Sequence, residues 1–231
     1  MTFLALLAAA GARATPGVIL LPLSNEFQWS RATVSSIVSI NIFLYGLIGP
    51  FAAAIYQRFG FRRSMMAAMT LLAAGYGCAT FATAYWQFVV LWGFVVGIGS
   101  GLAASVLGAA VATRWFNTRR GLVMGLLTAS TATGQLVFLP ALAQATTKLG
   151  WRSAPLLVAG ATLLVIPVIA WLMRDDPRDV GLGPLGEDNP LPPTGPAQGN
   201  PATRALSTLF EAVRYRDFWL LAGSFFVCGA S

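Results

Sequence analysis

The sequence has 231 residues, of which 56% are hydrophobic and only 10% carry a charge, and its mean hydropathy is +0.69. A soluble domain carries about 25% charged residues, so this composition excludes an ordinary water-soluble fold and indicates an integral membrane protein. The net charge of +7 could suggest a nucleic-acid partner. However, the arginines lie in short clusters between apolar runs, which argues against nucleic acid and fits the positive-inside rule of membrane proteins.

Six apolar stretches are long enough to cross about 30 Å of hydrocarbon as helices. They cover about 3–23, 33–56, 65–84, 88–112, 121–145 and 154–173. We therefore predict an all-α integral membrane fold whose first domain is a six-span bundle over 1–173. A seventh apolar stretch, 218–231, is too short to span. We interpret it as the truncated start of span 7, and the chain as a fragment of a larger protein.

The first apolar stretch contains an arginine at its midpoint. At 1.5 Å per residue, Arg13 lies about 16 Å from the start of the span, close to the bilayer centre. A charge there costs at least about 2.5 kcal/mol unless water or a counter-charge solvates it. None of the six spans contains Asp or Glu. Pro16 frees the carbonyl of Ala12, so the helix can kink beside the charge. We predict that Arg13, together with nearby Thr15, binds an anionic substrate; a structural pairing remains the alternative.

Other spans carry polar residues that could face the same substrate. Asn41 with Tyr45, and Thr131 with Gln135, are spaced i, i+4, so each pair shares one helix face. Ser100 lies in the fourth span. The predicted substrate-binding residues are therefore Arg13, Thr15, Asn41, Tyr45, Ser100, Thr131 and Gln135. The alternative for each residue is an interhelical hydrogen bond that only stabilises the bundle.

The fourth span also contains the glycine-rich stretch GFVVGIGSG, from Gly93 to Gly101. No strand precedes it, so it does not indicate a dinucleotide site, and glycines four residues apart in an apolar helix predict close helix packing. The sequence has no histidine, and Cys78 and Cys228 lie inside apolar stretches. We accordingly predict no catalytic residues, no metal, no cofactor and no enzymatic activity.

The basic residues predict how the chain crosses the membrane. The loops after spans 2, 4 and 6 hold most of them, whereas the loops after spans 1 and 5 hold few. We therefore expect the N-terminus and the even-numbered loops to be cytoplasmic in a multi-pass protein of the inner cell membrane. The loop 174–217 is rich in proline and reads as a cytoplasmic linker. Near its end, a short amphipathic helix is predicted from the spacing of Leu206, Leu209, Phe210 and Val213.

A short pattern recurs ninety residues apart. RFGFR at 58–62 follows span 2, and KLGWR at 148–152 follows span 5. Spans 1 to 3 and 4 to 6 thus look like two copies of one unit, which must lie in opposite orientations because three is an odd number of crossings. We expect Gly60 and Gly150 to form left-handed C-caps.

The stretch AAIYQRFGFRR resembles the loop after span 2 of the major facilitator superfamily. It supplies Arg58, Gly60, Arg62 and Arg63, but has Gln57 where the family has an acid. RWFNTRRGLVMGLLTAS, which includes Arg119 and Arg120, is similar to the start of span 5 in the monocarboxylate carriers and the bacterial oxalate/formate antiporters. Residues that match that pattern are Phe116, Arg119, Arg120, Leu122, Gly125 and Ala129.

The resemblance implies the N-terminal half of a twelve-span secondary transporter that works by alternating access. It implies a small organic anion as substrate, a proton or a counter-anion as the coupled species, and gating roles for Arg58, Gly60, Arg62, Arg63, Arg119 and Arg120. The expected partners are this solute, the lipid bilayer and a C-terminal six-span half. Alternatives are transport of a drug or another solute, and a half-transporter that does not transport and serves as a scaffold or is an incomplete gene product.

Overall fold

The computed structural model describes residues 1–181, 183, 185–186, 207, 210–216, 218–220 and 223–224. The chain divides into two compact units, Met1–Pro190 and Leu191–Ser231. The described residues of the second unit include helical residues at 210–212 and 218–220. The predicted linker, amphipathic helix and start of span 7 fall largely outside the described residues, Leu206 and Leu209 among them.

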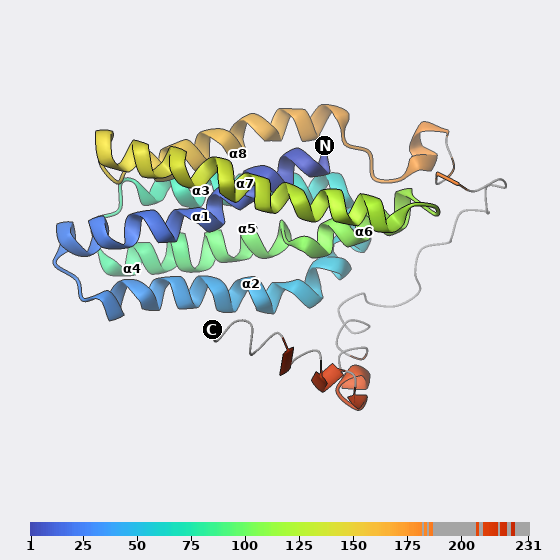
Figure 1. Cartoon of the computed structure of the whole chain (residues 1–231), viewed down its shortest axis with the longest axis horizontal. Coiled ribbons are helices and arrows are strands. Elements are labelled where there is room, and N and C mark those ends of the chain that lie inside the picture. Colours follow the sequence, from blue (N-terminus) through green and yellow to red (C-terminus); the bar gives the residue numbers. More distant parts are fainter. Residues whose placement is uncertain are drawn as a thin grey trace. The chain divides into compact units, whose positions relative to one another are not determined.

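The first unit is a bundle of long helices that run side by side (Figure 1). In the part of the chain that the structure describes there is no strand, only one isolated bridge between Phe116 and Leu185. The all-α prediction is therefore confirmed. The elements, in chain order, are α1 (Thr2–Phe27), α2 (Arg31–Phe59), α3 (Phe61–Ala79), α4 (Tyr85–Phe88), the π-helix η1 (Val89–Val96), α5 (Gly97–Leu102), α6 (Ser105–Trp115), α7 (Arg120–Leu149), α8 (Ser153–Leu172) and the 3-10 turn η2 (Pro177–Val180).

Five of the described helical segments are long and apolar enough to cross a membrane: α1, α2, the segment Tyr85–Trp115 from α4 to α6, α7 and α8. The helix α3, of 19 residues, is not among them. It begins at Phe61 and therefore includes Arg62 and Arg63, which lower its hydropathy, whereas the sequence predicts a span over 65–84. The third span is therefore a helix that follows the turn glycine Gly60 and ends at Ala79, at least four residues earlier at both ends than the sequence predicts.

Helix pairing in the bundle follows a two-fold pattern. The helix α1 packs along α7, α2 packs along η1 and α5, and α3 packs along α8. In terms of spans, these pairs are 1 with 5, 2 with 4, and 3 with 6. If spans 1, 2 and 3 are exchanged with spans 4, 5 and 6, the first pair becomes the second and the third pair stays the same. This is the pairing that two copies of a three-helix unit in opposite orientations produce, as the sequence repeat predicts.

Small residues allow the helices to approach closely. A Cβ atom added to Gly101 would lie 2.8 Å from the Cβ of Ile48 on α2, and one added to Gly97 would lie 3.2 Å from the carbonyl oxygen of Asn41. Between α1 and α7, a Cβ atom on Gly134 would lie 2.7 Å from the carbonyl oxygen of Leu7. The close packing predicted from the glycine spacing in span 4 is confirmed, and a similar contact joins the first and fifth spans.

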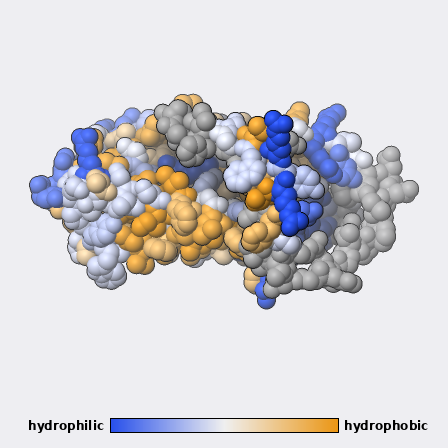
Figure 2. Space-filling model, turned by 90° about the horizontal axis from the view of Figure 1, so that it is seen from below, coloured by the Kyte–Doolittle hydropathy of each residue, from blue (hydrophilic) through white to orange (hydrophobic). Residues whose placement is uncertain are grey.

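On one face, the outer surface of the bundle is apolar across its middle (Figure 2). Figure 2 shows one face with a central hydrophobic band and hydrophilic side chains gathered toward both ends. Large side chains of α2 are exposed, including Ile42 at 63% and Phe43 at 67%. Such side chains are stable only against lipid or another apolar surface, as in a membrane-embedded bundle.

Candidate solute-binding site

A cavity of about 320 Å³ lies between the first, second and fourth spans. It brings together four of the residues predicted to bind substrate, namely Arg13, Asn41, Tyr45 and Ser100. The remaining lining residues are apolar: Ala12, Pro16, Val38, Ile42 and Val96. Its volume falls in the range of about 300–1,000 Å³ that small-molecule pockets occupy. The cavity is thus a small apolar chamber with a few polar groups and one cation.

The cation is Arg13, near the middle of α1. Its guanidinium donates a long hydrogen bond of 3.5 Å to the hydroxyl of Tyr45, and its central carbon lies 6.0 Å from the centre of the Tyr45 ring. Among the described residues, the two ion pairs join other side chains and leave Arg13 without a carboxylate partner. The guanidinium therefore keeps donors that an anion in the cavity could use.

Two further polar side chains are held by backbone groups. The amide nitrogen of Asn41 donates to the carbonyl oxygen of Trp92 over 2.8 Å, which leaves the amide oxygen of Asn41 as an acceptor. Trp92 lies in the π-helix η1, an irregular segment of the kind often found at functional sites. The hydroxyl of Ser100 donates to the carbonyl oxygen of Gly97 over 3.0 Å. These bonds fix the positions of the polar groups before a ligand binds.

The other three predicted binding residues do not line this cavity. Thr15 is fully buried and donates to the carbonyl oxygen of Gly11 over 2.9 Å within its own helix. Residues two positions apart in a helix, such as Arg13 and Thr15, are separated by about 200° around the helix axis. Thr15 therefore points away from the side of α1 that carries Arg13. Thr131 on α7 is half-buried and donates to the carbonyl oxygen of Thr128, and Gln135 is exposed.

The turn after α2 is held by the chain that follows α8. Gly60 has φ 83° and ψ 160°, and its N–H bonds to the carbonyl oxygen of Tyr56. The N–H of Arg62 donates to the carboxylate of Asp175 over 2.7 Å, and the Arg62 guanidinium donates to the carbonyl oxygen of Ala170 at the end of α8. Gln57, which replaces the family's acid, is exposed. In this chain Asp175 provides a carboxylate to the same turn.

The equivalent turn after α7 has the same backbone conformation. Gly150 has φ 85° and ψ 164°. Arg152 donates to the carbonyl oxygen of Thr80 over 3.2 Å, at the end of α3, and forms an ion pair of 2.6 Å with Glu26. Glu26 also accepts a hydrogen bond from the indole N–H of Trp151. In both turns, the arginine that ends the repeated pattern, Arg62 or Arg152, binds a carbonyl at the end of a helix from the other three-helix unit.

These two glycines differ from the expected left-handed caps in one respect. Their φ is positive as predicted, but ψ near 160° places them in a region that is essentially restricted to glycine. The chain therefore turns sharply, with Gly60 alone between α2 and α3 and with three residues, 150–152, between α7 and α8.

The remaining predicted gating residues lie on the surface. Arg58 is exposed, with its guanidinium carbon 5.4 Å from the Phe59 ring centre, and Arg63 and Arg119 are also exposed. Arg120 donates to the carbonyl oxygen of Phe116 over 2.6 Å and so fixes the turn before α7.

The sequence does not indicate several of the residues that contact the walls of the cavity and the turns. Arg114 at the end of α6 pairs with Asp176 over 2.9 Å and lies over the Phe61 ring. Tyr76 on α3, whose hydroxyl donates to the carbonyl oxygen of Ala12, has no signal in the sequence, because an isolated tyrosine in an apolar helix forms no pattern. The repeated pattern did contain a signal for Arg152, since its counterpart Arg62 belongs to a known motif.

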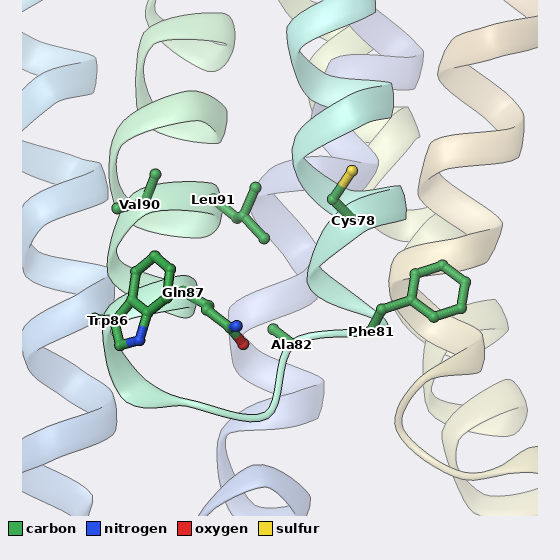
Figure 3. Close-up of a pocket in the computed structure, with 7 residues that line it drawn as sticks. All are labelled: Cys78, Phe81, Ala82, Trp86, Gln87, Val90 and Leu91. Carbon is green, nitrogen blue, oxygen red and sulfur yellow. The ribbon is translucent and has the colours of Figure 1, made fainter.

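A second cavity of about 330 Å³ lies between the end of α3 and the start of the fourth span (Figure 3). It contains no charged residue, and its one amide, that of Gln87, already accepts hydrogen bonds from the N–H groups of Thr83 and Ala84. It includes none of the predicted site residues. The cavity around Arg13 is therefore the better candidate for a polar solute.

Two inverted three-helix units are an architecture of membrane transporters, and here a largely apolar cavity with a few polar groups lies between the spans. The family model described as Major Facilitator Superfamily matches residues 1–231, so the chain belongs to this superfamily. It is accordingly a multi-pass membrane protein of a transporter family, and this family points to a transporter and not to an enzyme.

Similarity to individual proteins is lower. The chain is 26% identical over 160 residues to the uncharacterized MFS-type transporter YcxA of Bacillus subtilis, covering 69% of this chain and 39% of that protein. It is 28% identical over 177 residues to monocarboxylate transporter 14 of Homo sapiens, covering 74% and 34%. It is 30% identical over 171 residues to monocarboxylate transporter 13 of Bos taurus, covering 72% and 40%. The matched part thus spans about a third to two-fifths of these relatives.

Proposed function

We propose that this chain is the N-terminal bundle of a secondary transporter that moves small organic anions by alternating access. Arg13 carries the proposal, because it is a cation in the apolar cavity that has no carboxylate partner among the described residues. A guanidinium binds a carboxylate through two parallel hydrogen bonds, so the proposed substrates are small monocarboxylates or dicarboxylates. Relatives named monocarboxylate transporters support this class.

The rest of the cavity supports a particular way of holding such an anion. Arg13 would bind the carboxylate while Tyr45 and the free oxygen of Asn41 orient polar substituents. The apolar side chains of Val38, Ile42 and Val96 would surround a short hydrocarbon body. A substrate that neutralises Arg13 also removes the cost of the buried charge, which favours binding.

The two turns at Gly60 and Gly150 are proposed to keep the bundle rigid while it rocks against a second bundle. Each turn links the ends of the two three-helix units through an arginine and an acid, Arg62 with Asp175 and Arg152 with Glu26. We further propose that the N-terminus and the Gly60 turn face the cytoplasm, in accordance with the distribution of arginines. Coupling to a proton or to a counter-anion completes the proposal.

Uptake of labelled carboxylates with two to four carbons into proteoliposomes tests the proposal, with the protein expressed from its complete gene. Arg13→Ala should raise KM about tenfold to a hundredfold, since a hydrogen bond to a charged group contributes about 1.5–3 kcal/mol. Arg13→Lys should retain part of the affinity. Arg31→Ala, which removes an exposed arginine at the start of α2, outside the cavity, is the matched control.

Neutral analogues provide a second arm of the same experiment. The amide of a transported acid should not compete for uptake, because it cannot neutralise Arg13. Unchanged KM and rate in Arg13→Ala would contradict the anion-binding role, and competition by a neutral amide would contradict the substrate class. An imposed pH gradient and a preloaded anion then separate proton symport from anion exchange.

A further inference from the structure

Tyr76 lies on α3, behind the wall of the cavity that α1 forms. Its side chain is 1% exposed, and its hydroxyl donates a hydrogen bond of 2.6 Å to the carbonyl oxygen of Ala12. Ala12 is the residue before Arg13, and both residues line the cavity. Tyr76 itself does not line the cavity, so it contacts no ligand there.

The carbonyl of Ala12 needs a donor because of the proline four residues later. In a regular helix the N–H of residue 16 would bond to this oxygen, but Pro16 has no N–H. A buried carbonyl without a partner is costly, and the apolar interior offers few alternatives. The Tyr76 hydroxyl therefore replaces the missing helix bond at the turn that carries Arg13.

The rings of Tyr76 and Trp92 lie 6.5 Å apart, and the carbonyl oxygen of Trp92 accepts the hydrogen bond from Asn41. The polar groups on both walls of the cavity, Arg13 and Asn41, are thus supported from behind by neighbouring residues.

We propose that Tyr76 is a positioning residue that sets the affinity of the site by holding the proline-weakened turn of α1, and with it Arg13, in the geometry that receives an anion. This rests on the proposed function of Arg13 as the anion-binding cation. Tyr76 acts through the backbone of Ala12, so its loss alters where the guanidinium lies before the substrate arrives.

The first test is the kinetics of carboxylate uptake by Tyr76→Phe in proteoliposomes. The substitution keeps the ring and removes only the hydroxyl. KM should rise about tenfold while the maximal rate stays within about twofold, since the defect concerns binding. In an Arg13→Ala background, Tyr76→Phe should change KM by less than about twofold, because residues that act through one another are not additive.

The chain offers a matched control in Tyr56 on α2. Tyr56 is also 1% exposed, and its hydroxyl donates to a backbone carbonyl, that of Leu102, which does not line the cavity. Tyr56→Phe removes an equivalent buried hydrogen bond and should leave KM unchanged. Equal increases of KM in the two variants would overturn the proposal, because they would reflect a general loss of packing.

A second measurement does not depend on the substrate. Phenylglyoxal modifies arginine guanidinium groups, and mass spectrometry of peptides gives the rate at Arg13 relative to exposed Arg58 in the same sample. Tyr76→Phe should change this ratio by about threefold or more, and Tyr56→Phe should not. An unchanged ratio in Tyr76→Phe overturns the positioning role. If Tyr76→Phe changes the ratio but Arg13→Ala leaves transport unaffected, the positioning role is supported and only the proposed function is contradicted.

Discussion

Gly60 and Gly150 adopt the same backbone conformation although ninety residues separate them in the sequence. Their φ and ψ angles agree within a few degrees, at 83° and 160° against 85° and 164°. Each N–H bonds to the carbonyl four residues earlier, that of Tyr56 or Thr146. Each glycine also precedes a buried aromatic residue, Phe61 or Trp151. The repeated pattern in the sequence therefore corresponds to one turn that occurs twice.

The two glycines should nevertheless respond differently to alanine. Gly150→Ala meets no atom within 4 Å, so its cost should be the backbone strain alone, about 1–3 kcal/mol. At Gly60 an added Cβ would lie 2.7 Å from a carboxylate oxygen of Asp175. Gly60→Ala should therefore destabilise further, since it displaces the acceptor of the Arg62 N–H.

Thermal unfolding of the purified protein in detergent measures this difference. The extra cost of Gly60→Ala should disappear in an Asp175→Ala background, because the displaced carboxylate is then absent. Equal melting shifts for the two glycine variants would show that the contact with Asp175 has no energetic weight.

Two glycines on α7 provide a second matched pair. Gly134→Ala should separate α1 from α7, because the added Cβ would lie 2.6 Å from the Cβ of Ala10 and 2.7 Å from the carbonyl oxygen of Leu7. Overpacking of this kind costs about 1–3 kcal/mol. Gly125→Ala meets no atom within 4 Å and should be neutral or stabilise the helix by up to about 1 kcal/mol. Unfolding in detergent checks both values, and equal stabilities would contradict the close packing of α1 on α7.

Glu26 should stabilise the protein through Trp151 more than through its ion pair with Arg152. The side chains of Arg152 and Glu26 are 45% and 39% exposed, so the charge contributes about 0.2–1 kcal/mol. Glu26→Gln keeps an acceptor for the indole N–H of Trp151 and should cost no more than that amount. Glu26→Ala leaves the indole of a buried tryptophan unpaired and should cost about 1–3 kcal/mol.

Trp fluorescence during unfolding measures both Glu26 variants. The small loss in Glu26→Gln should shrink further in high salt, because salt screens exposed ion pairs. If Glu26→Gln proved as destabilising as Glu26→Ala, the charge and not the indole bond would be the main contribution.

A new acid in the cavity should compete with the substrate. Asn41 and Arg13 line the same cavity, so Asn41→Asp would give Arg13 an internal counter-charge. KM for a carboxylate should rise by about tenfold or more, equivalent to about 1.4 kcal/mol. Ser39→Asp places the same charge on an exposed position of α2, outside the cavity, and should leave KM unchanged. Equal effects of the two acids would argue for a general electrostatic effect.

Part of the site was accessible from the sequence because it depends on helix geometry alone. Asn41 and Tyr45 are one turn apart and line the same cavity, as predicted. The same geometry places Thr15, two residues after Arg13, on another side of α1. Thr131 and Gln135 also share a face, but no local rule indicates which neighbour that face meets. Rotation of α7 about its axis depends on contacts such as Gly134 against Leu7, which a single sequence does not specify.

The sequence by itself determined the class of protein, the helical fold, the repeated turn and the unpaired charge of Arg13. These follow from hydropathy, from the position of glycines and from the cost of a charge in hydrocarbon, all of which are local properties. Only the tertiary structure decided that the Tyr76 hydroxyl donates to the carbonyl of Ala12, which Pro16 cannot do because it has no N–H. It also decided that Asp175 provides a carboxylate to the turn at Gly60, where the nearby Gln57 carries no charge. Both contacts join residues distant in sequence, and the packing of helices brings them together.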